Sequence, residues 1–433
     1  MATKYQSFPG MEDILPGEVE NWQWLEEKAR IFFEAGGFQE IRTPLLEPTE
    51  LFTRSIGETT DIVHKEMYTF EDRGGRSMTM RPEMTASVAR AVIQNALLRN
   101  SKSLALYYMG AMFRAERPQA GRKRQFHQIG AEIINEAGVE ADLKIILALY
   151  SFLQSLQIKN LKLRLNDLTT LSGDQGESVR TQLRGFFEKH REKLDKDSVY
   201  RLDKNVLRIF DSKIPETQAI VADVPWDKMA PLSEAFQQLT VLLKQHGVAY
   251  EVERKLVRGL DYYTGSVFEI ALPNLGAQDA VAGGGRYDAL YAELGGGNVP
   301  CTGFSLGMER LLMALEKNEP SLEAQRRRQL IYFAPLSADG EAAQKIQNHV
   351  AAAAARFKAS GFQVRVGSVS AKIADHLSKA NKIGAGYVII KGADELKNGE
   401  WTYKDMERRE QKQIKEGELM NYLMKTIREG ETV

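Results

Sequence analysis

The sequence predicts an α+β domain, an antiparallel sheet flanked by helices, that carries a helical insertion and is followed by an α/β domain. Strand patterns joined by short connections recur through residues 1–325, which favours hairpins with helices on one side of the sheet. A polar and mostly helical stretch at 171–245 interrupts that pattern, and it predicts an insertion. Beyond residue 326, strand and helix patterns alternate, which is typical of a parallel α/β unit.

The elements of the first domain follow in order. Residues 20–37 predict an amphipathic helix that ends at two glycines, and residues 38–48 predict a strand. Residues 103–116 and 124–136 predict a strand pair joined by a basic loop. Three more segments complete the domain: a second strand pair at 250–260 and 266–272, then strand, glycine turn and helix at 279–294, and a final helix within 303–318.

A polar, charged segment with one proline, at 316–328, predicts a linker. The domain after it, residues 326–433, contains three strand patterns and two helical patterns. We expect strands at 330–336, 362–367 and 386–392, and helices at 339–361 and 370–385.

Composition narrows the class of protein. The 433 residues are 43% hydrophobic and 27% charged, which is typical of a globular protein of two or three domains. No run of apolar residues reaches the length of a membrane span, and the N-terminus lacks the apolar core of a secretory signal. A single cysteine excludes a disulfide framework, so we expect a cytoplasmic protein. Six scattered histidines show no zinc-ligand spacing.

The balanced net charge conceals an asymmetry. Residues 326–433 hold 19 Lys and Arg against 13 Asp and Glu, a net charge of +6. Because the whole chain has 58 of each, the preceding residues carry −6. A basic unit on an acidic body is compatible with a polyanionic partner, and equally with an ordinary solvated surface.

The segment from Phe113 to Ile133 is the first candidate site. Its loop is rich in arginine, and guanidinium groups form paired, charge-assisted bonds with phosphate oxygens. On the strand that follows, Gln128 and Glu132 share one face. Such a polar face is unsuited to packing in a hydrophobic core and suited to binding a ligand. The alternative is a solvent-facing strand with surface cations.

Two shorter stretches add candidates. Glu83 falls at the start of a helix, where a carboxylate either caps the helix or holds a ligand ammonium. Arg310 falls in the first turn of another helix, where it either helps to bind an anion or faces water. The sequence contains no P-loop, no dinucleotide fingerprint and no nucleophile triad. A phosphate site would therefore consist of arginines on an antiparallel sheet.

These segments resemble a known family. FRAERP (113–118), GFSLGMERL (303–311) and IRTPLLEP (41–48) resemble motifs 2, 3 and 1 of the class II aminoacyl-tRNA synthetases. LVRGLDYYTGSVFE (256–269) and GGGRYDAL (283–290) resemble the two signature segments of the histidyl-tRNA synthetase family. RPEMTA (81–86) and RQFHQIGAE (124–132) are similar to its histidine pocket. The similarity runs in the expected order from about Phe8 to the C-terminus.

The resemblance implies a class II catalytic domain over residues 1–325 and an anticodon-binding domain over 326–433. It implies that L-histidine reacts with ATP, with Mg²⁺ on the phosphates, to form histidyl-adenylate. The histidyl group would then pass to the 3′ end of tRNA(His). Motif 1 would form the interface of a homodimer, and no protein motif dedicated to a metal is implied.

The resemblance also implies roles at the phosphates. Arg258, Arg114 and Arg310 would be the catalytic residues. Arg258 would contact the histidine carboxylate and the α-phosphate, and Arg114 would hold the α-phosphate from the other side. Arg310 would bind the γ-phosphate and Arg122 the outer phosphates. Glu116 would meet the adenine amino group.

For the amino acid, the resemblance implies that Glu83 and Thr85 bind the α-ammonium. Glu132 and Tyr263 would each meet one imidazole nitrogen. A pocket that pairs both ring nitrogens rejects isosteres, because a mismatch leaves buried polar groups unpaired. Gln128, Tyr262 and Tyr287 would close the pocket. Gln119 would lie near the acceptor end of the tRNA.

Three positions depart from the family's usual pattern: Met84, where glycine is common, Asn135 and Lys144. Two alternatives to histidine–tRNA ligation stay open. One is the regulatory paralogue of ATP phosphoribosyltransferase, which binds histidine without charging tRNA and typically lacks the anticodon domain. The other is a class II synthetase of different specificity, such as prolyl or threonyl. Glu132 with Tyr262 and Tyr263 argues against the second alternative.

Overall fold

The computed structural model describes residues 5–57, 60, 62–119, 121–257, 260–272, 275, 279–318, 330–336 and 340–430. The chain divides into two compact units, Met1–Lys317 and Asn318–Val433. The expected boundary at residue 325 falls within 319–329, outside the described residues, and so does Arg258. No helix in the described ranges is long and apolar enough to cross a bilayer.

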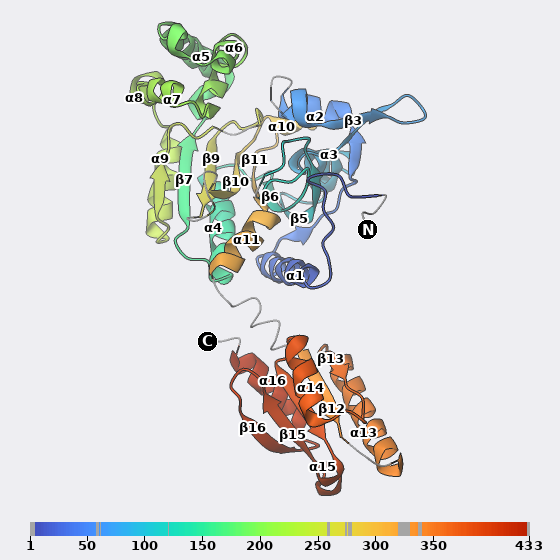
Figure 1. Cartoon of the computed structure of the whole chain (residues 1–433). Coiled ribbons are helices and arrows are strands. Elements are labelled where there is room, and N and C mark those ends of the chain that lie inside the picture. Colours follow the sequence, from blue (N-terminus) through green and yellow to red (C-terminus); the bar gives the residue numbers. More distant parts are fainter. Residues whose placement is uncertain are drawn as a thin grey trace. The chain divides into compact units, whose positions relative to one another are not determined.

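An eight-stranded sheet is the centre of the first unit (Figure 1). The pairs β1–β5 and β7–β8 at its two edges are parallel, and all other neighbours are antiparallel. The sheet is therefore largely antiparallel, as expected. Its strands, in spatial order, are β1 (Gln39–Glu40), β5 (Leu104–Phe113), β6 (Gln125–Ile134), β11 (Cys301–Gly307), β10 (Ala280–Arg286), β9 (Ser266–Ala271), β7 (Lys162–Asp167) and β8 (Tyr250–Val252).

Helices α1 (Val19–Ala35) and α4 (Val139–Ser155) cover one face of this sheet. Phe33 of α1 is fully buried and stacks on Tyr107 of β5, with ring centroids 5.7 Å apart. Its ring also lies 5.2 Å from that of Phe152 on α4 and 6.0 Å from that of Phe304 on β11. These aromatic contacts cover one face, so the other face is left for polar groups.

Smaller elements complete the first unit. A three-stranded antiparallel sheet consists of β2 (Leu46–Pro48), β4 (Ser77–Met80) and β3 (Tyr68–Glu71). The helices are α2 (Thr49–Ile56), η1 (Ile62–Glu66), α3 (Thr85–Gln94), η2 (Leu97–Arg99), α10 (Leu290–Glu293) and α11 (Met308–Asn318).

The insertion is helical, as expected, and it has its own core (Figure 1). Leu183, Phe187, Val206 and Ile209 are buried in that core. The final helix of the stretch, α9, instead packs on α4 beside the sheet. The helices are η3 (Thr169–Leu171), α5 (Gly173–Glu188), η4 (Arg191–Lys193), α6 (Lys196–Lys204), η5 (Val206–Asp211), α7 (Pro215–Ala222), α8 (Trp226–Met229) and α9 (Glu234–Gln245).

Three expectations for the first unit were wrong in detail. The strand expected at 38–48 is two short strands, β1 and β2, in different sheets. The expected pairing of 250–260 with 266–272 does not occur, because β7, which sequence reasoning missed, lies between β8 and β9. The glycines at 283–285 continue β10 instead of forming a turn. A Cβ on Gly284 would lie 2.1 Å from the carbonyl oxygen of Gly303, so close strand contact explains the glycine there.

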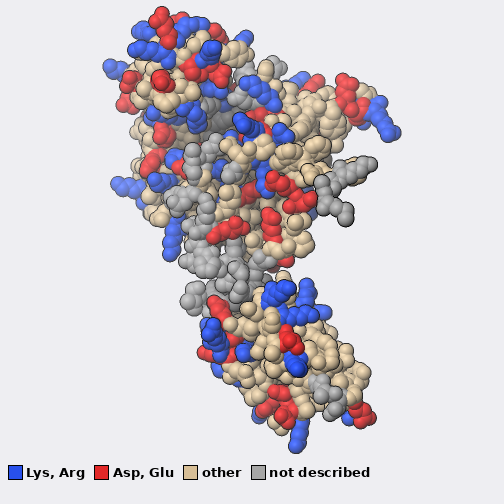
Figure 2. All heavy atoms as spheres, viewed as in Figure 1, with Lys and Arg blue, Asp and Glu red and all other residues tan. Residues whose placement is uncertain are grey.

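The second unit contains a five-stranded sheet in the order β13-β12-β14-β15-β16. The parallel strands were expected, but β15 and β16 add an antiparallel edge that was missed, so the sheet is mixed. Figure 2 shows Lys and Arg interspersed with Asp and Glu on the visible face of this unit. The elements are β12 (Leu330–Pro335), α13 (Gly340–Ala359), β13 (Gln363–Val366), α14 (Ile373–Lys382), β14 (Tyr387–Lys391), α15 (Ala393–Asn398), β15 (Glu400–Asp405), β16 (Gln411–Lys415) and α16 (Leu419–Gly430).

Candidate functional site

A cavity of about 270 Å³ opens on the sheet face opposite α1 and α4. Eleven of the thirteen residues singled out from the sequence line it. Of the other two, Arg258 lies outside the described residues, and Gln119 lies in the β5–β6 loop but is not part of the lining. The eleven are Glu83, Thr85, Arg114, Glu116, Arg122, Gln128, Glu132, Tyr262, Tyr263, Tyr287 and Arg310.

Glu132 is the buried acceptor at one end of the cavity. Its carboxylate accepts hydrogen bonds from Thr85 Oγ1 at 2.8 Å, from Tyr108 OH at 3.1 Å and from Tyr287 OH at 2.5 Å. Burial raises the pKa of Glu132 to about 8, although the Tyr287 and Thr85 hydroxyls oppose that rise. Gly303 faces it across the strand ladder, where a Cβ would lie 1.5 Å from Glu132 Oε2.

Glu83 caps helix α3 and faces the cavity as well. Its two carboxylate oxygens accept from the backbone amides of Thr85 at 2.7 Å and Ala86 at 2.9 Å, so Glu83 caps the helix while it also lines the cavity. Burial raises the pKa of Glu83. Met84 between these residues has φ −116° and is buried in the core, so the glycine that is common there is not required by backbone geometry.

Gln128 lies beside these carboxylates. Its side-chain nitrogen donates to Ser305 Oγ at 3.3 Å, and its buried oxygen has no hydrogen-bond partner within the described part of the chain. A buried polar atom without a partner costs free energy unless water or a ligand satisfies it. The amide oxygen of Gln128 is therefore a buried acceptor in the wall of a cavity that Glu83 and Glu132 also line.

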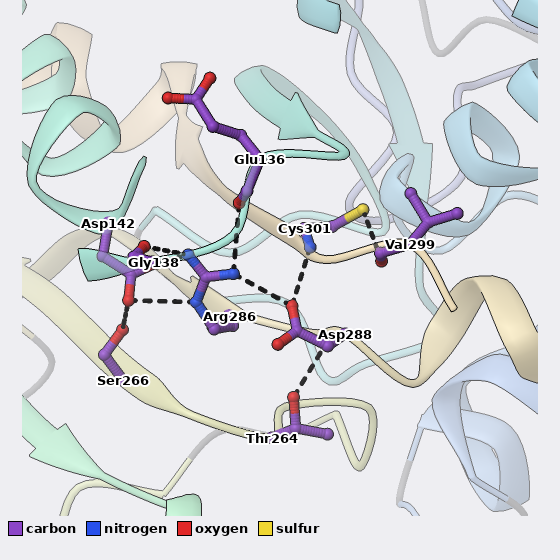
Figure 3. Close-up of polar contacts among 9 residues, drawn as sticks. All are labelled: Glu136, Gly138, Asp142, Thr264, Ser266, Arg286, Asp288, Val299 and Cys301. Atoms are coloured by element: carbon purple, nitrogen blue, oxygen red, sulfur yellow. Dashed lines mark hydrogen bonds and ion pairs between the residues drawn. The ribbon is translucent and has the colours of Figure 1, made fainter. Parts of the chain in front are cut away.

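Arg286 anchors the two segments that carry Tyr287 and Tyr263 (Figure 3). Its guanidinium contacts Asp142 Oδ1 at 2.8 Å and Asp288 Oδ1 at 3.1 Å, and it donates to the carbonyl oxygen of Gly138 at 2.8 Å. The amide of Asp288 donates to Thr264 Oγ1 at 3.0 Å, and the amide of Cys301 donates to Asp288 Oδ1 at 2.8 Å.

The residues of this network flank the pocket tyrosines directly in the sequence. Arg286 and Asp288 are the two neighbours of Tyr287, and Thr264 follows Tyr263. The rings of Tyr262 and Tyr287 lie 5.6 Å apart in an edge contact, and Tyr262 and Tyr263 lie 4.8 Å apart. Sequence reasoning assigned the tyrosines but missed the network that orients them.

The other end of the cavity is cationic. Arg114 follows β5, donates to the carbonyl oxygen of Pro82 at 2.9 Å and lies over the Phe126 ring at 5.2 Å. Burial and the neighbouring Arg122 both lower the pKa of Arg310 at the start of α11. Arg122 forms a 3.1 Å ion pair with Glu116. Converging guanidinium groups of this kind favour an anionic ligand, because a bound anion would relieve their repulsion.

Tyr108 and Glu309 are among the lining or supporting residues that were not assigned from the sequence. Tyr108 donates a hydrogen bond to Glu132. Leu106 pairs with Glu132 across β5 and β6, and Tyr108 lies on the same face as Leu106 because side chains alternate along a strand. Strand alternation was therefore the available signal. Glu309 lines the cavity and accepts from the backbone amide of His127 at 2.9 Å. Asn135 and Lys144, the other two departures from the family pattern, are not in the lining.

No group of three or more His, Cys, Asp or Glu side chains suited to a metal ion occurs among the residues that the structure describes. A small divalent ion bound by one carboxylate and the oxygens of a ligand needs no such group. The lining carboxylates besides Glu83, Glu132 and Glu116 are Glu269 and Glu309.

Comparisons with known proteins point to one family. The family model "Histidyl-tRNA synthetase" matches residues 10–311, and the model "Anticodon binding domain" matches residues 331–426. A histidine–tRNA ligase of Halorhodospira halophila is 44% identical over 405 residues, covering 93% of each protein. One from Synechococcus sp. WH7803 is 43% identical over 404 residues, covering 92% of this chain and 90% of the relative.

A solved structure has a similar fold. The apo histidyl-tRNA synthetase of Staphylococcus aureus matches with a TM-score of 0.71 and 30% identity, covering 97% of this chain and 99% of that one. The similarity therefore includes residues of both compact units.

Proposed function

Because the chain belongs to the histidyl-tRNA synthetase family, we propose that its cavity activates L-histidine with ATP and passes the histidyl group to tRNA(His). The protein is an aminoacyl-tRNA ligase. The observation that carries the proposal is the polarity of one cavity, with the Glu132 cluster at one end and arginines at the other. That polarity suits an imidazole-bearing amino acid joined to a polyphosphate.

At the acidic end, Glu132 accepts a hydrogen bond from one imidazole nitrogen, and Tyr263 pairs with the other. The α-ammonium binds next to Glu83 and Thr85, and Gln128 Oε1 supports this assignment as a buried acceptor in the cavity wall. A phenylalanine or leucine side chain would offer no ring nitrogen to Glu132 and Tyr263, and those buried polar groups would lose their ligand hydrogen bonds. This loss is the physical basis of selectivity for histidine. Tyr262 and Tyr287 close the pocket around the ring.

At the basic end, Arg114 holds the α-phosphate while the histidine carboxylate attacks it, and pyrophosphate leaves. Negative charge gathers on the five-coordinate phosphorus, so fixed guanidinium groups stabilise the transition state. The family resemblance alone assigns the second contact with the α-phosphate to Arg258. Arg122 and Arg310 bind the outer phosphates, and Glu116 meets adenine. ATP thus replaces the 3.1 Å Arg122–Glu116 ion pair with two new contacts.

Mg²⁺ would enter on the ATP phosphates. The cavity lining suits this arrangement because it contains the carboxylates Glu269 and Glu309, and the described residues include no cluster of three or more metal ligands. The ion would supply charge neutralisation, and the protein's own arginines would orient the nucleotide.

The partner assignments rest on separate features. The match of residues 331–426 to an anticodon-binding model supports tRNA binding and disfavours the regulatory paralogue.

Exposed Leu45, Leu46 and Phe70 lie on or beside the small β2-β4-β3 sheet and support a homodimer through motif 1. A Leu46→Glu variant should shift the protein toward monomer in sedimentation experiments, and an unchanged mass would refute that interface. A cytoplasmic location follows from this role in translation.

The experiment that tests the function is ATP–pyrophosphate exchange with each of the twenty amino acids in the absence of tRNA. Exchange with histidine alone supports the proposal. Measurable histidine binding with no exchange for any amino acid would favour the regulatory paralogue instead. Exchange with proline or threonine would contradict the assignment of Glu132 to the imidazole.

A further inference from the structure

The loop that carries Tyr262 and Tyr263 lies where the helical insertion meets the catalytic part of the first unit. Leu256 and Val257, which precede the loop, belong to or pack against the insertion's core. Tyr263 packs against that core and also against the core cluster beneath the cavity. Tyr262 belongs to the second cluster and is 3% exposed. The tyrosines proposed for the imidazole therefore form part of the interface between the two regions.

One ion pair crosses this interface at the loop itself. Arg208, on η5 of the insertion, donates from Nη2 to Asp261 Oδ1 at 2.6 Å. The Arg208 side chain is 10% exposed and that of Asp261 is 34% exposed, so the pair is partly shielded from water. Asp261 immediately precedes Tyr262 and Tyr263.

The insertion holds Arg208 firmly. Its flanking residue Ile209 is fully buried in the insertion core, as is Val206 two residues earlier. The carbonyl oxygen of Arg208 accepts from Arg201 Nη1 at 3.2 Å. A shift of η5 would therefore be transmitted to the guanidinium group, and through the ion pair to Asp261.

Asp261 is held from the other side by the end of helix α2. Its amide donates to the carbonyl oxygen of Ile56 at 3.0 Å. Gly57 has φ +99°, and a Cβ there would lie 2.5 Å from Asp261 Oδ2. The carboxylate therefore occupies space that only a glycine leaves open. With its amide bound to α2 and its carboxylate bound to the insertion, Asp261 is fixed at both ends.

We propose that Arg208 is a positioning residue for histidine recognition: through Asp261 it holds the Tyr262–Tyr263 loop in its binding conformation. The inference rests on the proposed function for the identity of the ligand and adds a role for the insertion. Arg208 does not line the cavity that contains Tyr262 and Tyr263, although it lines a second cavity together with Arg114, Arg122 and Arg310, so its effect on histidine passes through the loop. Histidine affinity then depends on where the insertion holds η5.

The test measures the KM of histidine and the KM of ATP separately in ATP–pyrophosphate exchange. Arg208→Gln keeps the length and polarity of the side chain but removes its charge, and Asp261→Asn does the same for the partner. Each should raise the KM of histidine about tenfold and leave the KM of ATP within about twofold, because one partly shielded charged pair is lost. Equal changes in both constants would overturn the proposal.

The double variant and two controls sharpen the test. Arg208→Gln with Asp261→Asn should lose less than the sum of the two single changes, because both disrupt the same ion pair. Additive losses would overturn the proposal. Arg191→Gln is the matched control, since it removes surface ion pairs with Glu188 and Asp203 on the same insertion. It should leave the KM of histidine unchanged, and a tenfold rise would show that general damage to the insertion is sufficient.

Arg208→Lys separates positioning from folding. It keeps a cation in place, so the KM of histidine should lie between those of the wild type and Arg208→Gln, with wild-type thermal unfolding. A KM as high as that of Arg208→Gln in a protein of unchanged melting temperature would argue against the ion pair. Failure of the wild type to exchange with histidine would refute the proposed function, whereas an active wild type with an unaffected Arg208→Gln would refute only this inference.

Discussion

Replacing Glu132 by Gln tests both the binding site and its electrostatics. The carboxylate accepts from three hydroxyls, on Thr85, Tyr108 and Tyr287. An amide offers one acceptor oxygen and places an NH₂ group against at least one of those hydroxyls. A buried hydroxyl left without an acceptor costs about 1–3 kcal/mol. We therefore expect kcat/KM for histidine to fall roughly 10- to 100-fold, with the KM of ATP little changed.

The same substitution should alter how stability depends on pH. The pKa of Glu132 rises from 4.5 in a free side chain to about 8 in the folded protein. Between these values the folded state holds a proton that the unfolded state has lost, so the free energy of unfolding falls as pH rises. The slope is at most about 1.4 kcal/mol per pH unit, and the loss levels off above the folded pKa. Gln cannot titrate, so the variant lacks this loss.

Urea unfolding of the ligand-free protein at pH 5, 6, 7 and 8 measures the difference. The stability of Glu132→Gln relative to the wild type should increase across the series by as much as a few kcal/mol. Glu136→Gln is the control, because that carboxylate is partly exposed and pairs with Lys144 at 3.4 Å. Parallel curves for the wild type and Glu132→Gln would show that Glu132 is ionised with an ordinary pKa, and would refute the reasoning.

Three further outcomes are expected. Arg258→Ala should lower histidine-dependent pyrophosphate exchange by about 10²–10³-fold, as loss of one transition-state donor typically does, and a few-fold loss would contradict its role. A chain that ends at Arg326 should keep adenylate formation and lose tRNA charging, measured by filter binding of labelled histidine, whereas equal loss of both would make the second unit a structural support. Arg286→Met should raise the KM of histidine and destabilise the protein by about 3–5 kcal/mol in urea unfolding, because it leaves the buried Asp142 carboxylate uncompensated. Wild-type stability would mean that the network in Figure 3 contributes little.

Much of the candidate site was predictable because it lies in a few short segments with distinctive residues. The alternation on β6 placed Gln128 and Glu132 on one face, and both line the cavity. The arginine-rich loop was recognisable from composition alone, and Arg114 and Arg122 do meet in the lining. The family resemblance supplied the remaining assignments, and the comparisons confirm the family.

The sequence by itself determined many of the local elements and the chemistry of the side chains, because strand alternation, helix periodicity and residue type are local properties. Tertiary structure alone decided which distant segments meet. It placed β7 between β8 and β9, made the glycines of β10 part of a strand, and brought Tyr108 to Glu132. It also joined Arg208 to Asp261 across 53 positions. Such contacts depend on how layers pack and on where space is left for a buried charge, and no window of local sequence contains that information.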